Sequence, residues 1–245
     1  MISVVMAVNR YDEYVDASIL SILNQSFKNI EFIIVANGEK HKEIHEELNA
    51  KYHADIRVRI HSLPIGQLAF ALNYAISISR YDIIARMDAD DISISDRLQK
   101  QYCFLNENNL DLVGTAIQLI NENDLVIGDI FYPDSAKIKK VLKFKNCFAH
   151  PTIMFRKKIF LKCRGYNGGF NSEDYDLWVR MSEYDPRWDN MQECLLSYRV
   201  HTNSTQRSKL AYCECAGYSL RDFLKSKTIK NFLAFIYHTA KALVK

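Results

Sequence analysis

The stretch Ile84-Ala-Arg-Met-Asp-Ala-Asp-Asp91 decides the fold of this chain, because an apolar strand runs directly into a cluster of carboxylates. Residues 81–87 are predicted to form that strand. Carboxylates two residues apart at a strand end offer the hard oxygen ligands that Mg²⁺ and Mn²⁺ prefer. Acidic clusters also occur as exposed turns or helix N-caps. The position of this cluster directly after an apolar strand favours a metal site.

Strands and helices alternate on the N-terminal side of this stretch. Short apolar runs predict strands, and helical spacing of apolar residues predicts helices between them. Such alternation predicts an α/β fold with a mostly parallel central sheet flanked by helices, whose ligands bind at the carboxyl ends of the strands. Asn9, Asn37 and Asp88 all follow predicted strands, which indicates a site at that edge. The strands are expected at 2–8, 31–35, 56–61 and 81–87, and the helices at 15–23, 40–52 and 68–78.

The rest of the chain is less regular. Its length of 245 residues fits one domain with a tail, and only 8 Gly and 4 Pro leave no room for a long linker. The patterns predict a helix at 95–105, a hairpin of strands 112–120 and 125–131, a strand at 147–155, a helix at 174–183, a strand at 195–201, and helix from 209 onward.

Composition excludes several classes of protein. A formal net charge of +3 is too small to argue for a nucleic-acid partner. The six cysteines form no CxxC pair, and no histidine lies at zinc-finger spacing from one, so free buried thiols in a reducing cytosol are expected. The chain starts with a short apolar run and no basic leader, and no stretch approaches the ~18 apolar residues of a membrane span. A cytoplasmic protein is therefore predicted.

Further motifs follow one another in order over residues 2–201. They are Ser3-Val-Val-Met-Ala-Val-Asn9, Ser18-Ile-Leu-Ser-Ile-Leu-Asn-Gln25, Glu31-Phe-Ile-Ile-Val35, Gly66, Ala71-Leu-Asn73, the acidic stretch, Asp96-Arg-Leu98, His150-Pro-Thr152, Gly165-Tyr166, Ser172-Glu-Asp-Tyr-Asp-Leu-Trp-Val-Arg180 and Leu196-Ser-Tyr-Arg-Val-His201. Each is weak alone, but in this order and spacing they resemble family-2 glycosyltransferases. The chain is most similar to bacterial enzymes that build surface polysaccharides such as capsule, exopolysaccharide or O-antigen.

The resemblance implies the GT-A fold of nucleotide-diphospho-sugar transferases. It implies a catalytic domain at 1–208, with a nucleotide-binding half at 1–91 and an acceptor half at 92–208, before a helical tail at 209–245. It also implies an inverting transfer of a sugar from a nucleotide-diphosphate donor to an acceptor hydroxyl, with Mn²⁺ or Mg²⁺. The expected product belongs to a surface polysaccharide or lipopolysaccharide.

The resemblance also assigns roles to residues. It makes Asp90 the main metal ligand, places Asp88 toward the ribose and metal, and makes His201 the residue that completes the metal shell. Asp174 matches the catalytic base, which takes the proton of the attacking hydroxyl. Because Asp174 starts a predicted helix capped by Ser172, the helix dipole is expected to lower its basicity.

Other polar residues are expected around the donor and the base. Arg86, Arg199 and Arg207 are candidates for gripping the diphosphate, since a guanidinium binds such oxygens in a bidentate fork. Residues 202–209 form a polar stretch that could close over the donor. Ala7, Asn9 and Asn73 are expected at the donor, and Glu173, Asp91 and His150 in supporting positions. The aromatic Tyr175 and Trp178 are predicted to be core residues rather than an acceptor platform.

The chain departs from the family pattern at Ala36-Asn37-Gly38, where members usually carry an Asp pair before the glycine. The second of those acids typically accepts the uracil N3–H. Asn37 can accept through its amide oxygen and donate as well, so a uridine donor is predicted, with thymidine the next choice. Ala7 replaces the usual proline at the end of the first strand, a minor change.

Two rival functions remain. A nucleotidyltransferase of similar fold would carry a Gly-rich loop with Arg and Lys after the first strand, whereas Ala7-Val-Asn-Arg-Tyr-Asp-Glu13 contains no glycine. A non-catalytic nucleotide-sugar-binding relative would be expected to have lost Asp90 or Asp174, and both are present.

The segment Lys225 to Lys245 has a different character, with an apolar stripe at helical spacing and lysines but no acid. A cationic amphipathic helix suits an anionic membrane surface, and a helix packed on its own domain is the alternative. We expect docking on the inner face of the cytoplasmic membrane, where a lipid-linked acceptor would be presented. The stripe is Ile229, Phe232, Leu233, Ile236, Ala240, Leu243 and Val244, and the lysines are Lys225, Lys227, Lys230, Lys241 and Lys245.

Overall fold

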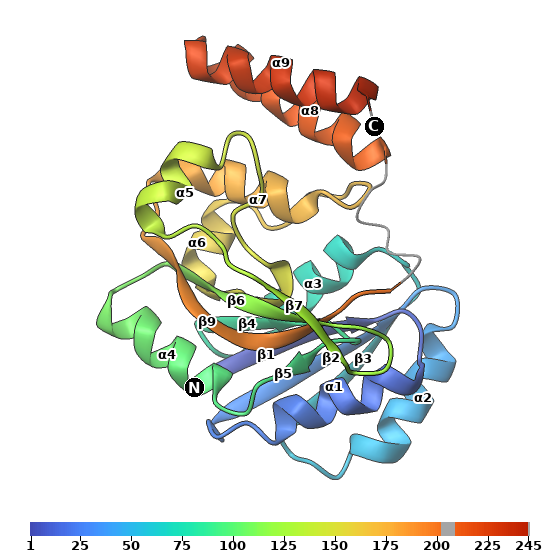
Figure 1. The fold of residues 1–245 in the computed structure, drawn as a ribbon. Helices are drawn as coiled ribbons and strands as arrows, with labels where there is room; N and C mark the ends of the chain where they lie inside the picture. The colour runs from blue at the N-terminus through green and yellow to red at the C-terminus, as the bar shows by residue number, and fades with distance from the viewer. Residues whose placement is uncertain (202–208, 245) are drawn as a thin grey trace.

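A computed structural model describes residues 1–201 and 209–244 of the chain. Figure 1 shows a central twisted sheet with helices on both faces and a pair of C-terminal helices stacked beyond one end. Within the described residues nine strands form one sheet, in the order β3-β2-β1-β4-β8-β6-β9-β5 with β7 on β6. The predicted α/β fold is confirmed.

The N-terminal half is the parallel part of the sheet. Strands β3, β2, β1 and β4 lie side by side and parallel, and helices connect them. The predicted elements are all present, with β3 starting two residues later than expected. The strands are β1 Ile2–Val8, β2 Ile30–Asn37, β3 Val58–Leu63 and β4 Ile83–Met87, and the helices are α1 Glu13–Leu23, α2 His41–Tyr52 and α3 Leu68–Ser77.

Two apolar cores cover the two faces of this sheet. Alternate side chains of a strand point to opposite faces, so Met6 and Ile34 belong to one core and Val5 and Ile33 to the other. The first core lies under α1, α2 and α4, and the second under α3, α6 and α7. Burial on both faces explains why β1 and β2 read as continuous apolar runs.

The C-terminal half of the sheet mixes strand directions around β6. This strand pairs parallel with β9 and antiparallel with β7 and β8. The elements are β5 Ile92–Ser93, α4 Arg97–Glu107, β6 Leu112–Ile120, β7 Val126–Ile130, α5 Ser135–Val141, η1 His150–Thr152, β8 Met154–Arg156, α6 Lys157–Lys162, α7 Glu173–Met181, η2 Ser182–Tyr184 and β9 Trp188–Arg199.

Two expectations for this half are wrong. The predicted strand at 147–155 is a buried loop and a 3₁₀ turn for most of its length, and only Met154–Arg156 is a strand. Pro151 at the start of the turn has no N–H to give to a sheet. The run is apolar because Phe148 packs against the rings of Trp178 and Trp188. The last strand is also longer than predicted, since β9 starts at Trp188.

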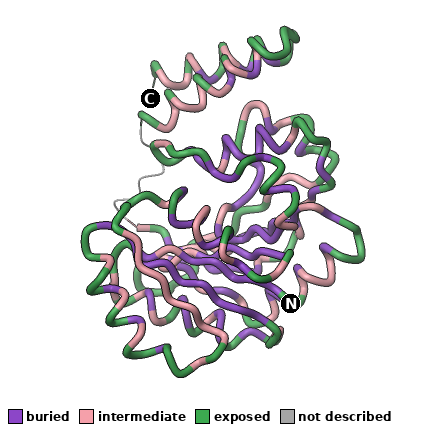
Figure 2. The backbone as a smooth tube through the Cα atoms, turned by 180° about the vertical axis from the view of Figure 1, so that it is seen from behind, coloured by how far each residue is buried: buried purple, intermediate pink, exposed green. Residues whose placement is uncertain are grey.

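The C-terminal helices α8 (Lys209–Lys225) and α9 (Ile229–Val244) pair with each other. Figure 2 shows buried backbone concentrated in the central strands, whereas most of these two helices is exposed or intermediate. No helix among the described residues is long and apolar enough to cross a membrane. All six cysteines are free thiols, but only Cys147 and Cys163 are buried, whereas burial was expected of all.

Candidate active site

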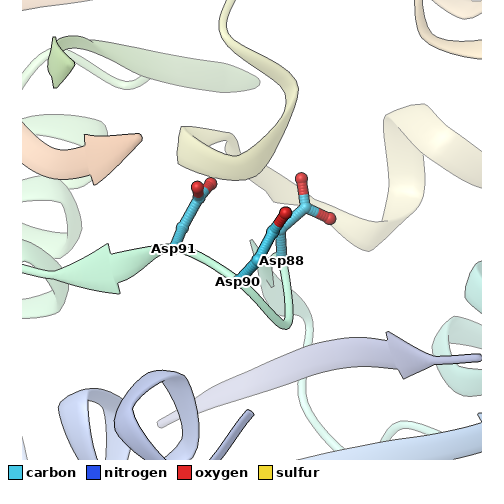
Figure 3. A group of neighbouring side chains, drawn as sticks. All are labelled: Asp88, Asp90 and Asp91. Carbon is cyan, nitrogen blue, oxygen red and sulfur yellow. The ribbon is translucent and has the colours of Figure 1, made fainter. Parts of the chain in front are cut away.

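Three carboxylates project from the turn between β4 and β5. Figure 3 shows Asp88, Asp90 and Asp91 pointing to the same side of this turn. One oxygen from each lies within 4.8 Å of the others. A hydrogen bond from α1 stabilises the turn, because Ser18 Oγ donates to the Asp88 carbonyl at 2.6 Å. The sequence pattern therefore does gather acids at the carboxyl edge of the sheet.

The acidic turn carries more negative charge than its surroundings neutralise. Burial and the charges of Asp88 and Asp90 raise the pKa of Asp91 well above its usual range. Burial also raises the pKa of Asp88, against the opposing effect of Arg86. Asp91 Oδ2 is buried and has no hydrogen-bond partner among the described residues. This set of oxygens fits a divalent cation, which would relieve the repulsion.

His201 and Arg199, at the end of β9, lie against the same turn. His201 Nε2 is 2.9 Å from Asp90 Oδ2, so two of the predicted metal ligands are side by side. Arg199, predicted to grip a diphosphate, is instead 3% exposed. Its Nε donates to the Asp90 carbonyl at 2.9 Å and its Nη1 to Asn121 O at 3.0 Å, and its guanidinium lies 4.2 Å from the centroid of the Tyr14 ring. These contacts brace the turn.

Arg86 lies beneath Asp88 and forms a two-pronged ion pair with it. Its Nη1 donates to Asp88 Oδ2 at 2.6 Å, its Nη2 contacts Asp88 Oδ1, and the side chain is 2% exposed. The Nε atom has no partner among the described residues. Arg86 thus supplies a fixed positive charge at the base of the cleft.

A cleft of about 370 Å³ opens in front of the acidic turn. It is continuous with a second cleft of about 500 Å³, because Asn9, Arg10 and Gly66 line both. Such volumes suit a small-molecule ligand. The first cleft is lined by the predicted donor residues Ala7, Asn9, Asn37, Arg86 and Asp88, by the predicted metal ligand Asp90 and by Asn171.

Asn37 presents an unpaired acceptor at this cleft. The residue is 2% exposed and ends β2. Its Nδ2 donates to Ile65 O at 3.4 Å, while its Oδ1 has no partner among the described residues. A buried acceptor without a donor costs about 1–3 kcal/mol. The site is therefore complementary to a ligand that brings an N–H or O–H to this point.

Asp174 stands at the start of α7, opposite the acidic turn. Its Oδ2 accepts from Asn146 Nδ2 at 2.6 Å and its Oδ1 from Tyr175 N–H at 2.6 Å. Its charge is among the causes that raise the pKa of Asp88, so the two sites are neighbours. Burial raises the pKa of Asp174 despite these hydrogen bonds. The N–H groups at the helix start lower the pKa as expected, but desolvation outweighs them, so the expected net loss of basicity is not found.

The supporting residues are joined through Tyr166. Asn73, predicted to bind the donor, exchanges two hydrogen bonds of 2.9 Å with the main chain of Tyr166. Gly165 (φ +71°) is needed beside it, since a Cβ there would lie 2.6 Å from Asn73 Oδ1. His150 Nε2 lies 2.8 Å from Tyr166 Oη, and burial and Arg86 hold the pKa of His150 well below its usual range. Asn73 and His150 therefore position the loop.

Other predicted residues have simpler outcomes. Glu173 is 9% exposed, and burial followed by the charge of Asp174 raises its pKa. Trp178 and Tyr175 are buried, so the prediction that they are core residues is confirmed. Arg207 and all of the predicted closing stretch 202–209 except Lys209, which starts α8, lie outside the described residues.

Three further residues contribute to this site although they were not predicted from the sequence. Tyr11 lines the second cleft, Asn171 lines the first, and Asn146 bonds the carboxylate of Asp174. The nearness of Asn171 to the Ser172-Glu-Asp motif was a usable signal. Asn146 had none, because it reaches Asp174 only through the fold.

The fold and this site define a transferase of the α/β class. Its site combines a two-part cleft, an acidic turn that lines the cleft and a separate carboxylate. The family model "Glycosyl transferase family 2" matches residues 3–165. The chain belongs to glycosyltransferase family 2, and it is a glycosyltransferase.

Known proteins resemble the chain over its whole length. It is 59% identical to the O-antigen biosynthesis glycosyltransferase WbnJ of Escherichia coli, over all of this chain and 97% of that protein. It is 31% identical to an uncharacterized glycosyltransferase of Methanocaldococcus jannaschii, over 97% of this chain and 83% of the relative. The crystal structure of S. aureus TarS 1–349 in complex with UDP-GlcNAc has a TM-score of 0.68 at 12% identity, over 99% of this chain and 80% of that one. This last likeness supports the fold.

Proposed function

We propose that the protein is a metal-dependent, inverting glycosyltransferase that moves a sugar from a uridine diphosphate sugar to a hydroxyl of a bacterial surface-polysaccharide acceptor. The observation that carries the proposal is the juxtaposition of the acidic turn, the two-part cleft and Asp174. A single in-line displacement needs the leaving diphosphate and the base on opposite sides of the sugar. The turn and Asp174 supply those two sides.

Asp90, Asp88 and His201 would hold Mn²⁺ or Mg²⁺, with Asp91 behind them. The bound ion would neutralise charge on the departing diphosphate, so that no separate acid is needed there. Arg86 adds a fixed positive charge at the same end of the cleft. Arg199 keeps the acidic turn in place through the Asp90 carbonyl.

Asp174 is the proposed base. The acceptor oxygen forms a bond to the anomeric carbon, the bond from that carbon to the diphosphate oxygen breaks, and the acceptor proton moves to an Asp174 oxygen. The electron pair of the broken bond leaves with the diphosphate. Because burial raises the pKa of Asp174, it is a stronger base than an exposed aspartate. Asn146 and the Tyr175 N–H each hold one oxygen, which leaves the second lone pair of each oxygen for the acceptor.

The preference for uridine rests on Asn37. Its unpaired Oδ1 would accept the uracil N3–H, and its amide could donate to a ring carbonyl. The TarS relative of this fold was crystallised with UDP-GlcNAc, which supports the same class of donor. A purine would not present this edge at the same place.

The acceptor class follows from the relative that is 59% identical, whose name assigns it to O-antigen biosynthesis. We propose a saccharide acceptor of that kind, carried on a lipid. The enzyme would then work at the inner face of the cytoplasmic membrane.

The tail supports this location. Each stripe residue predicted on α9 is exposed, Ile229 and Leu243 by 81% and 83%. The helix packs on the domain through a different, more polar face, with Asn231, Ala234 and His238 buried. The alternative expectation, in which the stripe itself packs on the domain, is not met: the helix packs through other residues and leaves the stripe exposed. We propose that the stripe enters an anionic membrane surface.

One screen tests the proposed reaction. Purified protein is incubated with a panel of nucleotide sugars with and without Mn²⁺, and donor hydrolysis and thermal stabilisation are measured. Stabilisation and slow hydrolysis with a uridine diphosphate sugar, dependent on Mn²⁺, are expected. Tight guanosine or adenosine diphosphate binding without uridine diphosphate binding would overturn the donor assignment.

Co-sedimentation with vesicles tests the membrane contact. The variant Ile229→Ser/Leu243→Ser keeps the buried face of α9 and removes two exposed side chains. It should bind anionic vesicles more weakly than the wild type, and binding should fall as salt screens the lysines. Leu125→Ser, an exposed apolar residue beside β7, is the matched control. Salt-insensitive or absent binding by the wild type would refute the membrane contact.

A further inference from the structure

The loop between Tyr166 and α7 reaches from the tail to the donor cleft. Its residue Asn171 lines the cleft together with Asp88 and Asp90, and it does so in the left-handed region, with φ +74°. Asn171 is one of the few residues that adopt this conformation readily. The position of this loop therefore determines whether the Asn171 side chain lies beside the reacting end of the donor.

Two glycines let the loop pass between two side chains. A Cβ on Gly168 would lie 2.7 Å from Gln67 Nε2, at the start of α3. A Cβ on Gly169 would lie 2.5 Å from Glu214 Oε1, on α8. The loop is thus held between the catalytic domain on one side and the tail on the other.

Glu214 holds the loop through both of its oxygens. Its Oε1 accepts from the Phe170 N–H at 2.7 Å, and its Oε2 accepts from the Ser172 hydroxyl. Tyr218 Oη, one turn further along α8, lies 3.3 Å from the same hydroxyl. Hydrogen bonds to an ionised carboxylate are about twice as strong as neutral ones. Asn171 is the residue between the two that Glu214 binds.

Ser172 shows that this contact replaces a local one. It occupies the N-cap position of α7, where a serine hydroxyl ordinarily accepts from a helix N–H. Here it makes no such bond and donates to Glu214 instead. The first turn of the helix that carries Asp174 is therefore oriented from α8.

Other contacts make α8 a firm support for Glu214. Arg221 Nη1 on α8 lies 2.8 Å from Asp176 Oδ1, which is fully buried on α7. Arg180 Nε lies 2.7 Å from the other oxygen of Asp176. Because Asp176 is fully buried, removal of a partner would leave part of its charge uncompensated in the interior. The tail helix is fixed to the catalytic helix, so Glu214 has a rigid base.

We propose that Glu214 is a positioning residue for sugar transfer: it sets the loop that carries Asn171 into the donor cleft and orients the start of the helix that bears Asp174. The tail is then a working part of the transfer site as well as a contact surface. This inference rests on the proposed glycosyltransferase reaction. It extends that reaction to a residue outside the segment that the family model matches.

The test compares variants by release of uridine diphosphate from the uridine diphosphate sugar that the panel selects. Glu214→Ala should lower kcat by about 10-fold, since a misplaced loop spoils the reacting geometry. The affinity for uridine diphosphate alone should stay within about 2-fold, because Asn37 and the acidic turn are untouched. Glu214→Gln, which keeps the shape and can still accept from Phe170 N–H, should recover most of the loss.

Glu183→Ala is the matched control. Glu183 also ties the tail to the domain, through Lys225 at 2.9 Å, but it does not touch the loop. It should leave kcat unchanged. If Glu183→Ala lowers kcat as much as Glu214→Ala does, the effect belongs to the attachment of the tail and the proposal is wrong.

A double-mutant cycle separates positioning from general stability. Asn171→Gly removes the side chain while tolerating the positive φ. If Glu214 acts through this loop, Glu214→Ala should add little to the loss caused by Asn171→Gly. Fully additive losses would overturn the proposal. A wild-type protein that binds and hydrolyses no nucleotide sugar would instead refute the proposed function itself.

Discussion

The proposed donor edge and the proposed acceptor side of the cleft are built in different ways. At the donor edge, neighbouring parallel strands end in Asn9, Asn37 and Asp88, so the topology alone brings their side chains together. On the acceptor side, Asp174 depends on Asn146, which precedes it by 28 residues, and on Glu214 in the tail. Strand order can therefore place a binding site, whereas a base is placed by contacts between distant segments.

The largest expected effect separates the two sides. Asp174→Asn should lower turnover by about 10²-fold or more, the usual weight of a general base, while donor binding stays nearly intact. Steady-state kinetics and calorimetry with uridine diphosphate measure the two effects. Asp129→Asn, at an exposed position on β7, is the control. Near-normal turnover of Asp174→Asn would remove Asp174 from the role of base.

The next effect belongs to the donor edge. Asp90→Ala should abolish the part of donor affinity that depends on Mn²⁺, because it removes the carboxylate that faces His201. We expect the affinity for uridine diphosphate with Mn²⁺ to fall by about 10-fold or more, to the value measured without the metal. Calorimetry with and without Mn²⁺ gives both values. A variant that still gains affinity from Mn²⁺ would place the metal elsewhere.

A smaller effect is expected at Asn37. Asn37→Leu has similar volume and removes the unpaired acceptor, so uridine diphosphate should bind about 5- to 10-fold more weakly, which matches the usual value of one hydrogen bond. Guanosine diphosphate binding should not change. Thermal unfolding of the free variant checks that the fold is kept. Equal losses for both nucleotides would mean that Asn37 does not read the base.

The smallest effect is a shift in pH dependence. The reaction needs ionised Asp174, so the rate falls as the pH drops through the pKa of this group. The Asn146 amide stabilises the ionised form and lowers that pKa. Asn146→Ala should therefore move the acidic limb of the kcat profile to higher pH and leave the plateau above it nearly unchanged. Asn108→Ala, an exposed asparagine on the far side of the domain, should not move the limb.

The sequence predicted the donor edge better than the acceptor side because strand order places the donor edge, whereas contacts between distant segments place the acceptor side. Buried parallel strands are recognisable in the sequence as apolar runs. The polar residues that follow these runs are then predicted to lie at the strand ends. The strand predicted at 147–155 was wrong because an apolar run can form a buried loop as well as a strand. The roles expected for Asn73 and Arg199 could not be checked from sequence, since both side chains turn to main-chain groups of segments far along the chain.

Electrostatic expectations failed at Asp174 for a related reason. A helix start is visible in the sequence, and it suggested a lowered pKa. The burial that raises the pKa comes from the surrounding fold and has no local signature. The tail illustrates the same limit, because the stripe on α9 was recognised while the polar face that docks on the domain was not.

The six free cysteines give the tail a built-in attachment point for a fluorophore. Burial raises the pKa of Cys147 and Cys215 to about 12 and that of Cys163 to about 11, so these thiols resist alkylation. Cys213 on α8 is exposed. A maleimide dye would thus react first at Cys213, without an engineered cysteine, and more slowly at the partly buried Cys103 and Cys194. If the proposed membrane contact forms, the emission colour of the dye would report the approach of lipid to that turn of α8 in real time.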